Sequence, residues 1–285
     1  MRSHTLFTIM FILLTLNFNC EKVDNETKMT NWFILQSSET ENGAHHTKHF
    51  DTFGERIKDF NNGINEAILK GIDIVQSHAM DGGKYFIGIN AVPTESPVNY
   101  NLQLFNKKLL EIPRSSSYCS GSTYAAFIEA LNILLMDESE RLSDDRFEAM
   151  RMQELDGGRR EDCIKFWGYW NADGFGNHFA LHQYSQMGET ISPRDARPGD
   201  FMNISWKNGG GHSVIFLGWI VENGENKLMY WSSQTGTNGY GDQIVSLQRI
   251  ADVKVVRLTK PENIFNFDVN AVVDLKIPGD VIDWN

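Results

Sequence analysis

The chain has 285 residues, of which 41% are hydrophobic, and its formal net charge at pH 7 is −11. This length suffices for one large domain with a sizeable hydrophobic core. The acidic balance and the lack of any long Lys/Arg cluster argue against nucleic acid as a partner, because phosphate recognition needs a basic surface.

The first 19 residues are typical of an export signal. Arg2 supplies a short positive start, and the mostly apolar run 6–16 is too short to span a bilayer. Cys20 follows directly, which leaves two alternatives open: attachment of a lipid anchor to Cys20, or simple cleavage nearby. In both cases we expect an exported protein, periplasmic or at the cell surface.

Residues 20–42 are polar and lack periodicity, and this composition predicts a tether. We expect residues 43–285 to form a single domain, with an N-terminal extension at 43–110 and an insertion at 137–195. Three histidines lie near the start of this domain, and they suit either a metal ion or a solvated polar run. The sequence favours the solvated run for these residues, His45, His46 and His49.

Two helices and one strand are predicted before the insertion. Apolar residues at helical spacing predict a helix over 51–78 with a break near Asn61-Asn62-Gly63, and a short strand follows at 85–89. The clearest helix covers Ser120–Met136, where side chains are apolar almost all round, so we expect deep burial.

The insertion reads as a polar helical stretch followed by an aromatic, glycine-rich segment at 166–176. That segment suits a cleft wall and an ordinary packed loop equally well. His178 and His182 are spaced like two metal ligands on one helix. However, the sequence offers neither a third ligand nor a glutamate at HExxH spacing, so we predict no metal.

Beyond Pro198 the pattern changes to short strands separated by glycine-rich turns. We predict strands at 200–206, 212–221, 227–232 and 253–258, with turns at 208–211 and 223–224. A buried helix followed by an antiparallel β-meander predicts an α+β domain.

Cys119 lies at the start of the buried helix, where a helix N-terminus favours thiolate over thiol and free N–H groups suit an oxyanion. Capping oxygens are available from Ser115, Ser116 and Ser117, and Gly121 permits close backbone approach. The alternative is a Cys119–Cys163 disulfide, because exported proteins often pair their cysteines. The small, polar residues around Cys119 favour a nucleophile.

Three short motifs occur in order along the chain: Cys119-Ser120-Gly121, Ala196-Arg197-Pro198-Gly199-Asp200-Phe201 and Gly211-His212-Ser213-Val214-Ile215-Phe216-Leu217-Gly218. This series resembles the NlpC/P60 superfamily of papain-like cysteine peptidases and amidases, over roughly residues 115–245 without the insertion. The resemblance implies a papain-like core, with the buried helix packed on the β-meander. It also implies that Cys119 is the nucleophile, that His212 is the general base, and that peptidoglycan stem peptides are the substrate.

The third catalytic residue follows less directly, and the chain has Tyr118 where the family has Asp. Our first choice is Gln234, because its amide oxygen can accept the imidazole N–H, and Ser232 on the same strand face is second. A direct alignment with the family instead ends on Trp231. Tyr118 and Ser120 are expected to border the oxyanion site and the cleft.

The leading hypothesis is therefore an exported cysteine hydrolase that cleaves amide bonds in cell-wall peptides through a Cys119 thioester, without metal or organic cofactor. An acyltransferase or transamidase with the same Cys119–His212 site is one alternative. The other is a non-catalytic secreted glycan-binding domain that carries the Cys119–Cys163 disulfide.

Overall fold

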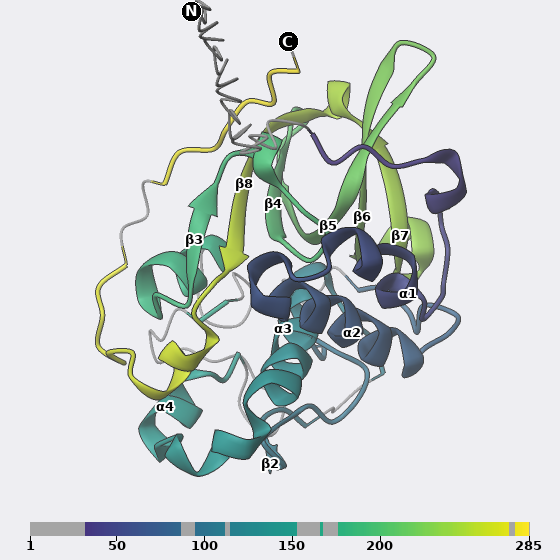
Figure 1. The fold of residues 1–285 in the computed structure, drawn as a ribbon. Coiled ribbons are helices and arrows are strands. Elements are labelled where there is room, and N and C mark those ends of the chain that lie inside the picture. The colour runs from purple at the N-terminus through teal and green to yellow at the C-terminus, as the bar shows by residue number, and fades with distance from the viewer. Residues whose placement is uncertain are drawn as a thin grey trace, which may run out of the picture. The chain divides into compact units, whose positions relative to one another are not determined.

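A six-stranded antiparallel sheet forms the centre of the computed structural model, with strand order β3-β8-β4-β5-β6-β7 (Figure 1). Its strands are β3 (Gly188–Ile191), β4 (Phe201–Trp206), β5 (Gly211–Glu222), β6 (Glu225–Gln234), β7 (Gly239–Ser246) and β8 (Ile250–Leu258). The structure describes residues 32–86, 95–111, 115–152, 166–167, 176–273 and 277–284. The α+β class is confirmed.

The four strands predicted beyond Pro198 are present as β4, β5, β6 and β8, and two further strands of this sheet were not predicted. β3 is a four-residue edge strand, and β7 begins Gly-Tyr-Gly-Asp, which lacks the usual alternation. The prediction of a simple meander is wrong at β8, which pairs with β4 instead of β7. Turn residues in the sequence indicate only hairpins between consecutive strands. They could not indicate that β8 pairs with β4, a strand that is not its neighbour in the sequence.

Two long helices pack against each other, α2 (Ile64–Ser77) and α3 (Cys119–Leu135), and α3 contacts β5 and β6 of the sheet. They pack closely because Gly71 has no side chain, and a Cβ there would lie 2.4 Å from the Ala126 carbonyl oxygen. Helix α3 with its following turn, Cys119–Arg141, is apolar enough to suit a membrane, but 67% of its apolar window is buried in the protein. It is a core helix, as its sequence predicts.

The predicted break in the first helical region is confirmed. Asn61 and Asn62 adopt left-handed backbone angles, with φ of 50° and 54°, and they separate α2 from the preceding short turns. The remaining helices and strands of the described residues are α1 (His49–Phe53), β1 (Gln103–Leu104), β2 (Lys107–Lys108), α4 (Asp144–Ala149) and the π-helix η5 (Phe179–Tyr184). Short 3₁₀ turns are η1 (Ser37–Glu39), η2 (Gly54–Ile57), η3 (Phe60–Gly63), η4 (Met136–Arg141), η6 (Pro193–Asp195), η7 (Thr235–Thr237), η8 (Leu247–Arg249) and η9 (Pro261–Phe265). Most of the predicted strand at 85–89 lies outside the described residues.

The tether prediction is wrong for the part from Trp32 onward. Phe33 and Leu35 are buried, and this segment pairs with β5 through hydrogen bonds in which Leu35 N–H donates to the Trp219 carbonyl (2.8 Å) and Trp219 N–H to the Phe33 carbonyl (2.9 Å). Gly218 leaves room for the Leu35 side chain. The apolar run is short and has polar residues on both sides, so the average composition of residues 20–42 does not indicate that part of the segment is buried.

The solvated run predicted for the three histidines is also wrong. The His49 side chain is only 1% exposed and lies between the carboxylates of Asp73 and Asp242. The two carboxylates come from α2 and β7, far apart in the sequence, so no local pattern indicates that His49 is paired.

Within the aromatic segment of the insertion, Phe166 and Trp167 are fully buried and pack around Tyr124, Phe127 and Phe201. These two residues therefore belong to the core, as the packed-loop interpretation expects. Residues 168–175 of the segment lie outside the described residues.

Candidate active site

Cys119 is the first residue of α3 and carries a free, partly exposed thiol. The serines before it do not cap the helix, because the N-cap position belongs to Tyr118, one residue beyond them. Ser117 Oγ instead lies 2.7 Å from Ser233 Oγ, and Ser116 Oγ donates to a Glu95 carboxylate oxygen at 3.0 Å. Ser117 and Ser116 thus connect the start of α3 to Ser233 of β6 and to Glu95.

The close backbone approach predicted at Gly121 is confirmed. A Cβ at this position would lie 1.8 Å from the carbonyl oxygen of Pro97, which also accepts the Tyr118 N–H at 3.3 Å. The loop at Pro97 therefore presses directly on the first turn of α3.

We expect Gly121→Ala to lower the free energy of unfolding by about 2 kcal/mol, because the new methyl group forces the Pro97 loop away from α3. Denaturant unfolding measures this change. The matched control is Gly236→Ala, where an added Cβ meets the movable end of the Gln243 side chain. If the two variants had equal free energies of unfolding, the Pro97 loop would have moved away from the new methyl group without loss of stability, and the prediction would be wrong.

His212 lies near the start of β5 and pairs with Ile204 of β4. On the other side of β5, Ile215 pairs with Trp231 of the antiparallel strand β6. Three residues further along the same register, His212 of β5 lies opposite Gln234 of β6. The His212 ring also packs edge-on against Tyr230, with ring centroids 5.5 Å apart.

The residue after His212 connects β5 to the nucleophile helix. Ser213 Oγ lies 2.9 Å from Thr123 Oγ1, one turn into α3, and the Ser213 backbone N–H interacts with the Cys119 thiol. The structure thus brings Cys119 to the backbone of Ser213, the residue after His212, although 93 residues of sequence separate Cys119 from Ser213.

The Gln234 side chain is oriented by the turn between β6 and β7. Its Nε2 donates to Thr237 Oγ1 at 2.6 Å and to the Gly241 carbonyl at 2.9 Å. Because a carbonyl only accepts, the amide nitrogen must face Gly241, and Oε1 points the other way. The side-chain interaction between Gln234 and His212 raises the pKa of the imidazole.

Two atoms at this contact have no other partner. Among the described residues, His212 Nε2 and Gln234 Oε1 are both buried and neither has a hydrogen bond of full geometry. A donor and an acceptor left facing each other in this way suit an imidazole whose Nε2–H is directed at the amide oxygen. Gln234 therefore occupies the position expected of the third residue.

The other candidates for that position are engaged elsewhere. Ser232 Oγ is fully buried and donates to the Ser213 carbonyl at 2.7 Å, so it supports the strand that carries His212. Trp231 Nε1 donates to Gln76 of α2 at 2.9 Å. Neither side chain orients the imidazole.

Of the two residues predicted to border the oxyanion site, Tyr118 and Ser120, only Ser120 directs its backbone N–H at the thiol. The backbone N–H of Tyr118 is donated to Pro97 and does not face the thiol, so the prediction for Tyr118 is wrong in this respect. The backbone N–H groups of Ser120 and of Cys119 itself do interact with the thiol. The first turn of α3 therefore offers donors where a tetrahedral oxyanion would form.

Burial decides the protonation of the pair. It raises the pKa of the Cys119 thiol, and the backbone N–H groups of Ser213, Ser120 and Cys119 oppose this without reversing it. Burial also lowers the pKa of His212 to about 4, against the raising effect of Gln234. The expectation of a lowered thiol pKa is wrong, because loss of hydration outweighs the favourable N–H groups.

Two tyrosines near the thiol were not predicted. Tyr85 bridges to Ser117 just before α3, and both Tyr85 and Tyr230 lie close enough to Cys119 for its charge to raise their pKa, although burial raises it more. Their hydroxyls therefore stay protonated and can donate. Tyr230 could have been predicted from the sequence, because the two-residue period of a strand places it on the same face as Gln234. Tyr85 lies 34 residues before Cys119, and no sequence pattern connects it with the site.

Asp200 of the second motif has a structural position. Its fully buried carboxylate accepts two hydrogen bonds from Arg257, at 2.9 and 2.7 Å, and one from Asn65 at 3.0 Å. It thus joins α2 and β8 at the beginning of β4.

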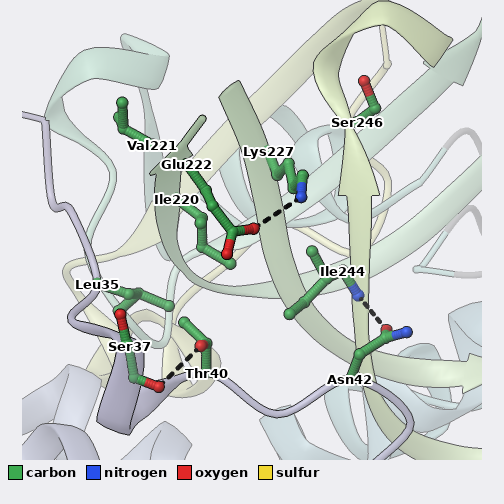
Figure 2. A pocket seen from close by; sticks show the side chains of 10 residues that line it. All are labelled: Leu35, Ser37, Thr40, Asn42, Ile220, Val221, Glu222, Lys227, Ile244 and Ser246. Carbon is green, nitrogen blue, oxygen red and sulfur yellow. Dashed lines mark hydrogen bonds and ion pairs between the residues drawn. The ribbon is translucent and has the colours of Figure 1, made fainter. Parts of the chain in front are cut away.

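A separate pocket of about 390 Å³ lies at the other end of β5 and β6 (Figure 2). Ile220 and Glu222 of β5 line it, and a Glu222–Lys227 ion pair of 2.9 Å crosses it. His212 and Gln234 lie at the opposite ends of their strands, roughly 30 Å away at about 3.3 Å per residue. This pocket is not part of the candidate active site.

No protein-family model matches the chain, and no curated protein or solved structure gives a significant match.

Proposed function

We propose that this protein is an exported cysteine hydrolase that cleaves amide bonds in peptidoglycan stem peptides. One observation carries the chemistry: a free thiol at a helix start lies against the backbone N–H of Ser213, the residue after His212, and Gln234 interacts with His212. A nucleophile, a base and an orienting group in this arrangement suit acyl transfer. The peptide substrate, the papain-like NlpC/P60 core and the export are proposed from the resemblance and the N-terminal sequence.

The mechanism begins from a neutral pair. His212 takes the proton of Cys119 as the sulfur attacks the amide carbonyl, and the backbone N–H groups at the helix start stabilise the oxyanion, each by about 3 kcal/mol. His212 then protonates the leaving amine, the C–N bond breaks and a thioester remains on Cys119. Water activated by His212 hydrolyses the thioester, which releases the acid and restores the thiol.

The free thiol of Cys119 favours this proposal over the disulfide-bonded binding domain, whose partner residue Cys163 lies outside the described residues. An acyltransferase uses the same first half-reaction and differs only in the acceptor of the acyl group.

The test is to trap the thioester. The protein is mixed with purified disaccharide-peptide fragments of peptidoglycan, quenched in acid and analysed as intact protein and as peptides by mass spectrometry. We expect an acyl adduct on Cys119 and a new amine product, with free acid forming in water. Acyl transfer to added glycinamide at low concentration would favour the transferase. A folded protein that forms neither adduct nor product would contradict the proposed substrate class.

We expect Gln234→Ala to lower kcat by about 100-fold with little change in KM, because the imidazole loses the group that sets its orientation. Steady-state kinetics on the cleaved fragment measure both constants. Gln243→Ala is the matched control, since this glutamine on β7 bonds to Asn42 and not to His212. An unchanged kcat in a folded Gln234→Ala protein would remove Gln234 from the site.

A further inference from the structure

Three side chains that can bind a metal converge outside the candidate active site: His46 before α1, His49 at the first position of α1, and Asp242 on strand β7. His49 Nε2 lies 3.0 Å from Asp242 Oδ1, and His46 Nε2 lies 3.1 Å from Asp242 Oδ2. One ligand atom from each of the three residues lies within 4.8 Å of the other two. Two imidazole nitrogens and a carboxylate thus face a common point.

A fourth residue orients the most buried of these ligands. His49 Nδ1 lies 2.6 Å from Asp73 Oδ1, so its Nε2 is the nitrogen that faces the cluster. Asp73 is itself held in place, because its two oxygens accept the backbone N–H groups of His49 and Phe50 at 2.9 and 3.0 Å. A carboxylate that receives Nδ1–H and directs Nε2 outward is the usual support of a metal-binding histidine.

The cluster also contains a buried oxygen that is not satisfied. Asp242 is fully buried, and among the described residues its Oδ2 has no hydrogen bond of full geometry, even though His46 Nε2 is 3.1 Å away. An unsatisfied buried carboxylate oxygen is costly. A cation bound between Oδ2 and the two Nε2 atoms would remove this cost.

We propose that His46, His49 and Asp242 bind one divalent zinc-type metal ion. Bonds of about 2.0–2.2 Å to nitrogen and oxygen place tetrahedral ligands about 3.3 Å apart, so the observed 3.0 and 3.1 Å separations need to open by only a few tenths of an ångström. Imidazole ligands select zinc-type ions over Mg²⁺ and Ca²⁺. The ion would also balance the charges of Asp73 and Asp242.

The position of the cluster gives the metal a structural role. The Asp242 backbone N–H donates to the Ala44 carbonyl at 3.0 Å, and His45 Nε2 lies 3.0 Å from the Thr237 carbonyl, so the histidine segment already lies along β7. A shared ion would bind this segment to the sheet, one residue from Gly241, which holds the Gln234 amide. The metal takes no part in the acyl-transfer steps.

The test uses full-length, chelator-treated Cys119→Ala protein, so that the thiol of the candidate active site cannot bind the ion. Calorimetric titration with Zn²⁺ is expected to give one site with a Kd of about 1 µM or tighter, and Mg²⁺ is expected to give none. His46→Ala in the same background is expected to weaken binding at least about 100-fold, and Zn²⁺ should raise Tm only where His46 is present.

His46→Ala is expected to fold, because the His46 side chain is partly exposed, at 23%. The matched control is His182→Ala, an exposed histidine on η5 that should leave the Zn²⁺ affinity unchanged. Absence of a stoichiometric site in the parent protein would overturn the proposal. So would equal Zn²⁺ affinity with and without His46.

Discussion

Cys119→Ala and His212→Ala are each expected to lower turnover at least about 10⁴-fold while the fold is retained. Removal of either member leaves no thiol nucleophile or no base, and residues that act as one unit lose nearly all activity when either is removed. Both side chains are partly exposed, and alanine is well tolerated in the first turn of a helix, so we expect only small changes in stability. Release of the amine product from peptidoglycan fragments measures the turnover.

The fold of each variant is checked by circular dichroism and thermal unfolding. His182→Ala serves again as the control, since it removes an exposed histidine far along the chain from Cys119. Wild-type turnover in Cys119→Ala would rule out acyl transfer through Cys119, and wild-type turnover in His212→Ala would rule out His212 as its general base.

The second large effect concerns the pH dependence of Cys119 alkylation. Burial raises the pKa of the thiol and lowers the pKa of His212 to about 4, so both groups are neutral at pH 6–7. A raised thiol pKa means less thiolate at every pH below it. We therefore expect the iodoacetamide rate to fall about tenfold per pH unit below an apparent pKa above the free-cysteine value of about 8.5.

A preformed thiolate–imidazolium pair predicts the opposite profile, with a plateau of high reactivity from about pH 4 to pH 8. At pH 6 the two states differ more than about 100-fold in alkylation rate. Rates are measured by the mass increase of intact protein without reductant, and Cys119→Ala corrects for the other cysteines. A plateau would mean that substrate-free protein already holds the charged pair, so His212 would act first as an acid.

The neutral pair has a mechanistic consequence for the proposed hydrolase. Because His212 stays neutral down to about pH 4, it remains available as a base over most of the acidic range. Proton transfer from Cys119 then accompanies the attack on the carbonyl.

The sequence alone predicted several local features of the fold correctly. Periodicity located α3 to within a residue and strands β4, β5, β6 and β8 closely, and Asn61-Asn62 marked a real break before α2. The motif residues Cys119 and His212 were also chosen from the sequence, and Gln234 was selected by its donor and acceptor chemistry. Such features depend on interactions between residues that are close in the sequence, so local sequence patterns are enough to predict them.

Only the tertiary structure decided which distant groups meet. It brought Tyr85 close enough to Cys119 to interact with its charge, buried His49 between Asp73 and Asp242, and paired β8 with β4. It also reversed the expected pKa of Cys119, since hydration depends on what covers the sulfur and not on its sequence neighbours. Burial and long-range pairing arise from packing of whole surfaces, which local periodicity does not encode.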